Sequence, residues 1–223
     1  MGKAEIGTIL IPGERQEILD RSIGRYRWYQ YLWKRLSAPL DKFEKNKLSV
    51  VTFNYDRSLE HVLFRSVKHT YGLKDEEAAA QLKTIEIVHV YGKLNELPYL
   101  QEGGRPYSPE IDTQIIRNAI PAIKILHEGV DNSPEFARAK ELLMQASVIC
   151  CLGFGYHETN IRRLGFNAMN GNRSQPTLWG TSLGLTRSEC LLIQEIFPWP
   201  LHQFVDSSDM KIVECLRHNR IIV

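Results

Sequence analysis

The sequence lacks the features that mark membrane, secreted and zinc-ribbon proteins. No apolar run approaches the roughly 18 residues that a membrane-spanning helix needs, and the N-terminal segment has neither the apolar length nor the cleavage site of a signal peptide. The cysteines contain no Cys-x-x-Cys pair, and the adjacent Cys150 and Cys151 lie in an apolar segment, where small buried side chains are the ordinary interpretation. These absences predict a cytoplasmic protein without a zinc ribbon or a disulfide framework.

The sequence also lacks the common catalytic and nucleotide-binding signatures. No Walker loop, no Gly-x-Ser-x-Gly turn and no cluster of His, Cys, Asp or Glu at metal-ligand spacing occurs. A Gly-x-Gly turn, whose backbone N–H groups approach the pyrophosphate at the start of a dinucleotide-binding fold, is absent before Leu48. We therefore expect no metal and an atypical N-terminal region.

The sequence also lacks an excess of positive or negative charge. The 28 Lys and Arg residues are interspersed with 26 Asp and Glu residues, so no nucleic-acid or membrane footprint stands out. Over residues 21–35 basic residues alternate with aromatic ones, a pattern compatible with base stacking or with a helix that has a wet basic face and a packed aromatic face. We favour the helix and expect neither nucleic acid nor a membrane as a partner.

The segment 48–63, LSVVTFNYDRSLEHVL, predicts a strand, a tight turn and a helix. Ser49 to Phe53 form a short, β-branched, nearly all-apolar run, which is typical of a buried strand in a parallel sheet. Turn residues follow, and from Ser58 the apolar positions recur at helical spacing. Because ligands bind at the carboxyl ends of strands in open α/β sheets, Asn54 and Asp56 are predicted to lie at the functional edge.

Strand and helix signals alternate along the rest of the chain, which predicts a single α/β three-layer domain with a mainly parallel sheet. We expect strands near 48–53, 85–91, 147–152, 176–179 and 201–205. Within the single domain 1–223, the predicted parts are an N-terminal helical segment (1–47), a core (48–205) and a C-terminal helix (206–223). Residues 92–109 are rich in Gly, Pro and other turn formers, which predicts a long loop that covers a site or is mobile. Short helices are expected at 110–118 and 121–127.

Three blocks occur in an order and at a spacing that resemble a known family. They are TFNYD followed by SLEHVL (52–63), IVHVYG (87–92) and ICCLGFGYH (149–157). They resemble the sirtuin-like (silent information regulator two-like) NAD-binding domains, in particular the prokaryotic and phage-defence branch without a zinc ribbon. The resemblance covers roughly 48–205 and implies a Rossmann-like (DHS-like NAD/FAD-binding) fold with NAD as substrate or ligand.

Members of this family carry a Gly-rich turn upstream of the segment that resembles residues 3–47. Its absence here predicts a domain without its first strand and phosphate loop, either a truncated reading frame in which Met1 is not the true start or a degenerate copy. The groove beside Val50 to Phe53 is then either open or covered by the N-terminal helices. An open apolar groove would promote self-association, which makes a homo-oligomer a candidate assembly.

The resemblance assigns Asn54 as a catalytic residue that orients a water or the nicotinamide ribose beside the scissile bond. The alternative is that Asn54 closes a turn or caps the following helix. Asp56 is likewise a ribose ligand or, more simply, a helix cap. Thr52, in the same block, is assigned to cofactor binding.

The second block places His89 as the candidate general base, because imidazole can accept a hydroxyl proton near neutral pH. Sirtuins place His directly before Gly, whereas here Tyr91 precedes Gly92 and His89 lies two positions earlier. Both side chains point to the same face of a strand. Either His89 faces the site one step deeper, or it is a core histidine and Tyr91 replaces it; Tyr91 and Gly92 are assigned to cofactor binding.

The third block supplies the remaining candidates for cofactor binding. The turn Gly153, Phe154 and Gly155 matches the glycine turn that contacts ribose and phosphate in the family, although a tight strand-to-helix turn needs the same glycines. Asn160 follows at a helix start, where anions bind. Gly180, Thr181 and Ser182 follow a short strand and match adenine-ribose contacts, with an ordinary turn as the alternative.

Two hypotheses follow from these motifs. The first is an NAD-binding protein with NAD glycohydrolase activity of the bacterial defence type, which cleaves the N-glycosidic bond weakly or has lost that activity. The second is a non-catalytic module that senses a nucleotide or contacts another protein. Without the phosphate loop we expect weak binding of NAD, in the high-micromolar range or weaker, because charge-assisted hydrogen bonds are worth roughly 1.5–3 kcal/mol each.

Overall fold

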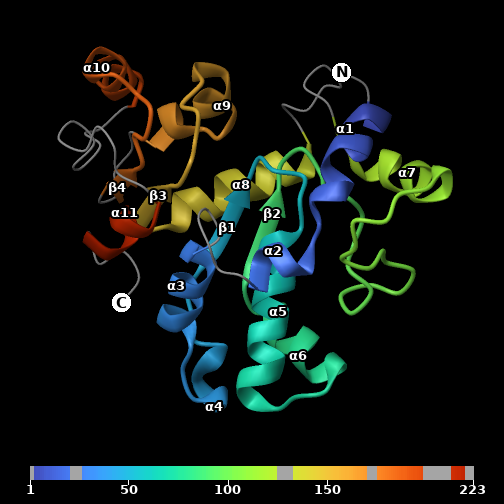
Figure 1. Ribbon diagram of the computed structural model, residues 1–223. Coiled ribbons are helices and arrows are strands. Elements are labelled where there is room, and N and C mark those ends of the chain that lie inside the picture. Colours follow the sequence, from blue (N-terminus) through green and yellow to red (C-terminus); the bar gives the residue numbers. More distant parts are fainter. Residues whose placement is uncertain (1–2, 21–26, 125–132, 170–174, 198–211, 219–223) are drawn as a thin grey trace. The chain divides into compact units, whose positions relative to one another are not determined.

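The computed structural model describes residues 3–20, 27–124, 133–169, 175–197 and 212–218 (Figure 1). The chain forms two compact units, residues 1–135 and 136–223. Both combine helices with a short parallel sheet, so the chain has a mixed α/β fold. In the described residues no helix is long and apolar enough to cross a membrane.

Short helices open the first unit. α1 (Lys3–Leu10) runs into the 3-10 turn η1 (Ile11–Gly13), where Pro12 and Gly13 stop the α-helix. α2 (Gln16–Asp20), α3 (Arg27–Leu36) and α4 (Leu40–Phe43) follow. In α3 the side chains of Tyr29, Leu32 and Leu36 are buried whereas Lys34 and Arg35 are exposed, which is the packed aromatic face and wet basic face that the sequence predicts.

The sheet of the first unit pairs β1 (Ser49–Thr52) with β2 (Glu86–His89) in parallel. Register places Thr52 opposite His89. The crossover consists of α5 (Ser58–Tyr71) and α6 (Asp75–Leu82), and Gly72, with φ of 65°, ends α5 in the left-handed conformation. The carboxyl ends of both strands therefore lie at one edge of the sheet.

The N-terminal helices cover part of this edge. Ile6 and Ile11 pack with Leu94, Ala119 and Ile123 in one buried cluster, and Leu10 and Tyr55 lie against it. The cluster joins α1 and η1 to α7 (Thr113–Ala119) and η3 (Ile120–Ala122). Of the two alternatives for the groove, the described residues support coverage by an N-terminal helix at the carboxyl end of β1.

The second unit is also built around two parallel strands. α8 (Pro134–Gln145) leads to β3 (Val148–Cys151), which pairs with β4 (Thr177–Gly180), so that Cys151 lies opposite Gly180. α9 (Glu158–Arg163) and the 3-10 turn η5 (Phe166–Met169) lie between the strands in sequence. α10 (Arg187–Ile196) and α11 (Ile212–His218) follow.

Most predicted elements are confirmed, and two details differ. The strands near 48–53, 85–91, 147–152 and 176–179 are present, and the one at 201–205 lies outside the described residues. The described strands form two separate two-stranded sheets rather than one. A helix at 121–127 is wrong where it can be checked, because Ile120–Ala122 is a 3-10 turn and Ile123 is extended. Division into a single domain stays a prediction.

Candidate functional site

A pocket of about 300 Å³ opens at the carboxyl end of β1. α1 contributes Ile6, Ile9 and Leu10, and the turn after β1 contributes four consecutive residues, Phe53, Asn54, Tyr55 and Asp56. Its volume is at the lower end of the range for small-molecule sites, and an apolar lining with a few polar groups is typical of such sites. The pocket therefore has the place that the sequence predicts and room for one ring system rather than for a dinucleotide.

Asn54 is held in this pocket through its backbone, which leaves its side chain available. Its N–H donates to Thr52 Oγ1 at 3.1 Å, and its carbonyl oxygen accepts from His89 Nδ1 at 2.7 Å. The side chain is exposed, and none of the described residues forms a hydrogen bond with its amide. An amide that both donates and accepts thus faces the pocket without a protein partner.

His89 is buried, with 6% of its surface exposed, and both of its ring nitrogens are engaged. Nδ1 contacts the Asn54 carbonyl, and Nε2 lies 2.6 Å from Oε1 of the buried Glu60. A carbonyl oxygen and a carboxylate oxygen both accept hydrogen bonds, so each ring nitrogen of His89 already faces an acceptor of the protein. In this arrangement neither nitrogen is free to take a proton from a ribose hydroxyl.

Glu60 is ionised in spite of its burial. Burial would raise the pKa of its carboxyl, but the hydrogen bond and charge of His89 outweigh this effect and leave the pKa below its usual value. Lys93 Nζ adds a second positive charge at 3.9 Å from Glu60 Oε1. His89 Nδ1 holds the Asn54 carbonyl oxygen, and Glu60 holds the His89 ring through Nε2. His89 is therefore a positioning residue for the pocket in this conformation.

The neighbouring candidates of this unit have contacts with the protein itself. Tyr91 is buried, and its ring meets that of the pocket residue Phe53 edge to face at 5.7 Å. Gly92 has φ of 79°, and a Cβ atom there would lie 1.8 Å from the Ala122 carbonyl oxygen. Asp56 Oδ1 accepts from the Ser58 N–H at 3.1 Å, as in an Asx turn, whereas the N-cap position of α5 is Arg57.

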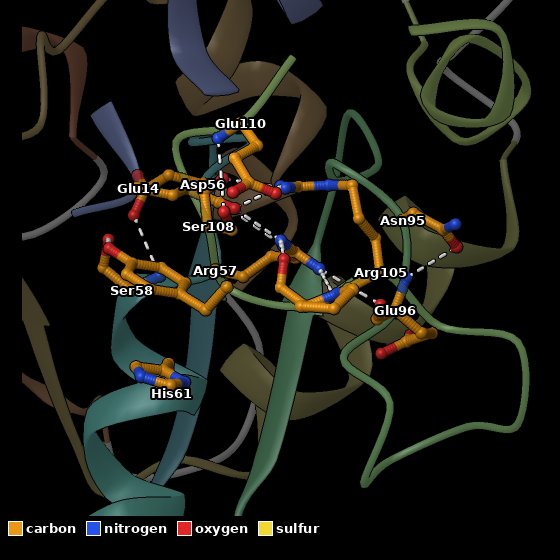
Figure 2. Close-up of polar contacts among 12 residues, drawn as sticks. Glu14, Asp56, Arg57, Ser58, His61, Asn95, Glu96, Arg105, Ser108 and Glu110 are labelled. Carbon is orange, nitrogen blue, oxygen red and sulfur yellow. Dashed lines mark hydrogen bonds and ion pairs between the residues drawn. The ribbon is translucent and has the colours of Figure 1, made fainter. Parts of the chain in front are cut away.

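Beside this pocket lies a buried cluster of Glu14, Arg57 and Arg105 that the sequence analysis missed (Figure 2). Arg57 Nε donates to Glu14 Oε1 at 2.9 Å, and its Nη2 bonds to Glu14 Oε2. Arg105 Nη2 binds the same Oε2 atom. Burial and the charge of Arg57 lower the pKa of Arg105, whereas Glu14 opposes them.

Arg57 also holds the long loop that follows β2. Its Nη1 donates to the carbonyl oxygens of Glu96 and Arg105, and its Nη2 to that of Pro106. At Gly104 a Cβ atom would lie 2.7–2.8 Å from backbone atoms of residues 96 and 97, so the loop is closely packed on itself. The predicted long loop is thus present, packed on itself and bonded to Arg57 through three backbone carbonyls. An isolated Arg just before a helix gave no sequence signal for this role.

A histidine on α5 contacts the same loop. His61 stacks on Tyr107 with ring centroids 4.2 Å apart, its Nδ1 contacts the Tyr99 hydroxyl, and its Nε2 contacts Gln16 Oε1 at 2.6 Å. Burial, together with the charges of Arg65 and Arg57, lowers the pKa of His61 to about 4. It is therefore neutral at physiological pH, donating to Gln16 and accepting from Tyr99.

The other candidates come together in the second unit. The Gly153 N–H donates to Thr181 Oγ1 at 2.7 Å, and the Tyr156 hydroxyl donates to the Thr181 carbonyl at 3.0 Å. Gly180, Thr181 and Ser182 are buried, whereas Gly153 and Gly155 are exposed and Phe154 and Asn160 are half-buried. The turns after β3 and β4 are thus joined at one edge of their sheet.

Comparison with known proteins adds no identity to this geometry: no protein-family model, no curated protein and no solved structure matches the chain. Among the described residues no group of three His, Cys, Asp or Glu side chains is arranged to hold a metal ion.

Proposed function

We propose that the chain is a sirtuin-like nucleotide-binding module that receives the nicotinamide-ribose end of NAD in the pocket at the end of β1. The observation that supports this most directly is the Asn54 amide, which lines that pocket and has no hydrogen-bond partner among the described residues. An amide can donate to and accept from a carboxamide or a ribose hydroxyl without charge, and the aromatic ring of Phe53 offers an apolar wall.

In this proposal cleavage of the N-glycosidic bond is weak or absent. A general base needs a free lone pair within hydrogen-bond reach of the proton that it removes. Both nitrogens of His89 are occupied by Asn54 and Glu60, so His89 acts as a base only if its ring leaves one of these partners. The geometry therefore favours binding and sensing of the nucleotide over its hydrolysis.

Binding is also expected to be weak. No Gly-rich phosphate loop precedes β1 in the sequence, and a pocket of about 300 Å³ holds only one part of a dinucleotide. Loss of two charge-assisted hydrogen bonds reduces affinity by roughly a hundredfold or more. A dissociation constant in the high-micromolar range or above is the corresponding expectation.

Calorimetry with NAD and an assay for released nicotinamide test this function. We expect weak binding that Asn54→Ala abolishes, while Asn118→Ala, at an exposed position on α7, leaves it unchanged. Nicotinamide release that depends on Asn54 and His89 would instead support an active NAD glycohydrolase. No binding at millimolar NAD would contradict the nucleotide site.

The second candidate function is a protein-interaction module. Its support is Ile9, which lines the same pocket and is 62% exposed, an unusual state for a large apolar side chain. Size-exclusion chromatography of the wild type and of Ile9→Ser distinguishes a homo-oligomer that uses this surface from a monomer. A clean monomer in both would leave NAD as the occupant to test.

A further inference from the structure

The helix α10 of the second unit carries two leucines on its outer side. Leu191 and Leu192 are 47% and 61% exposed, whereas Cys190 and Ile193 of the same helix are buried. At 3.6 residues per turn, the two leucines lie on the side of the helix opposite Cys190 and Ile193. α10 therefore packs into its unit with one side and presents neighbouring large apolar side chains on the other, which is a property of interaction surfaces.

The helix that presents these leucines is held at its start by a capping box. The Glu189 N–H donates to Thr186 Oγ1 at 3.3 Å, and the Thr186 N–H donates to Glu189 Oε2 at 2.7 Å. The burial of Cys190 and Ile193 holds its inner side. The outer side is thus a preformed surface, and a partner that binds it does not have to order the helix first.

Two side chains of opposite charge flank the leucines. Arg187 and Glu195 are both exposed, and each lies four residues from Leu191, at opposite ends of the helix. Positions four residues apart lie on the same face of a helix. Neither charged side chain is paired with another described residue. The outer face therefore reads positive, apolar and negative along the helix axis.

This order of charges makes the face complementary to itself. When two copies of α10 lie antiparallel with Leu191 in the middle, Arg187 of each copy is opposite Glu195 of the other. A two-fold interface has this property, because the same patch serves both partners. Parallel copies would instead bring Arg187 against Arg187, and a partner with charge of one sign would leave one end of the face opposed by like charge. A second copy of the chain is the occupant that matches both ends.

We propose that two copies of the chain form a homodimer through antiparallel pairing of α10. Leu191 and Leu192 of both copies meet at the centre, and one ion pair lies at each end. The helix has ten residues and is about 15 Å long, so the interface is small. We expect a weak dimer with a dissociation constant on the order of 10–100 µM. This proposal does not depend on NAD binding, and it uses α10 rather than the pocket beside Ile9.

Sedimentation equilibrium of the full chain across roughly 1–500 µM tests the dimer. The average mass is expected to rise with concentration from 25.7 kDa towards twice that value. Leu192→Ser weakens association by roughly tenfold or more, because the interface loses an apolar contact from each copy. Met144→Ser is the matched control: Met144 is a 59% exposed side chain on α8 of the same unit, and its substitution leaves association unchanged.

Charge reversal tests the antiparallel orientation. Arg187→Glu and Glu195→Arg each place like charges at both ends, so each variant alone associates roughly three- to thirtyfold more weakly. An equimolar mixture of the two variants restores association close to that of the wild type, because both ends of the mixed dimer again join opposite charges. The helix dipole favours Glu in the first turn and Arg in the last, so neither substitution opposes formation of α10.

Circular dichroism equal to that of the wild type shows that each variant is folded. A monomer across the whole concentration range overturns the proposal. A dimer that Leu192→Ser leaves intact, a dimer that Ile9→Ser abolishes, or a mixture of the charge variants that associates as weakly as either one alone overturns it as well.

Discussion

Arg57 and Glu14, 43 positions apart in the sequence, form an ion pair in which each side chain is only 1% exposed. The pair joins the segment after η1 to the start of α5, and the remaining donors of Arg57 reach three carbonyl oxygens of the loop after β2. All five N–H groups of this guanidinium are thereby used, which is the condition under which a buried arginine is tolerated.

Arg57→Met is therefore expected to destabilise the first unit by about 3–5 kcal/mol, because it leaves the Glu14 carboxylate buried beside a single arginine and frees three carbonyls. Chemical denaturation followed by circular dichroism measures the change. Arg65→Met is the matched control on the same helix: its ion pair with Asp20 is 36% and 55% exposed, and surface pairs contribute about 0–1 kcal/mol. Equal losses of stability in the two variants would contradict the inference that Arg57 holds Glu14 and the loop after β2 together.

Gly92→Ala is expected to be severe for two reasons. The residue has φ of 79°, and its new Cβ atom would overlap the Ala122 carbonyl oxygen. Left-handed strain costs roughly 1–2 kcal/mol and forced overpacking roughly 1–3 kcal/mol more. Gly72→Ala tests strain alone, because Gly72 has φ of 65° with nothing near its Cβ position. If thermal unfolding shows similar losses of stability for both variants, the backbone at Ala122 moves to accommodate the new Cβ atom.

The sequence predicted local structure well because local structure depends on local patterns. The apolar run before Asn54 places β1 within one residue of its bounds, and the helical spacing after Ser58 places the start of α5. The position of the pocket follows from the same reasoning, since the polar turn after a parallel strand lies at the carboxyl edge of the sheet. Such inferences need only neighbours in the chain.

The buried charges did not follow from the sequence because they are satisfied over long separations. Nothing near Arg57 in the chain indicates that its partners are Glu14 and the carbonyls around Arg105. The same holds for His89, whose chemical state depends on Glu60, 29 positions earlier. A single sequence does not pair such residues, and whether His89 is free to act as a base depends on that pairing.

Acid is expected to destabilise the first unit through His61. Its pKa is lowered from 6.5 to about 4 in the folded protein, so the unfolded chain binds the proton more strongly. Stability is then complete above pH 6.5, decreases as the pH falls, and stops decreasing near pH 4. Denaturation midpoints measured between pH 7.5 and 4 should show this slope in the wild type.

His61→Gln removes the titrating group and retains a polar side chain between Gln16 and Tyr99, so it should reduce the slope between pH 6.5 and 4. His69→Gln, at an exposed position near the end of the same helix, should leave the slope as it is. An unchanged slope in His61→Gln would show that other groups carry the acid sensitivity.

Thr181→Val tests the connection between the two turns of the second unit. The Thr181 hydroxyl accepts from the Gly153 N–H at 2.7 Å, and Val has the same shape without an acceptor. Loss of the partner of a partly buried N–H costs about 1–3 kcal/mol, so the exchange of the Gly153 amide hydrogen should accelerate while that of distant amides changes less. Thr181→Ser retains the hydroxyl and should protect Gly153 as the wild type does. If Gly153 exchanges equally fast in Thr181→Val and Thr181→Ser, the hydroxyl does not hold the glycine turn; if only Thr181→Val accelerates it, the same variant should also weaken any NAD binding that uses this turn.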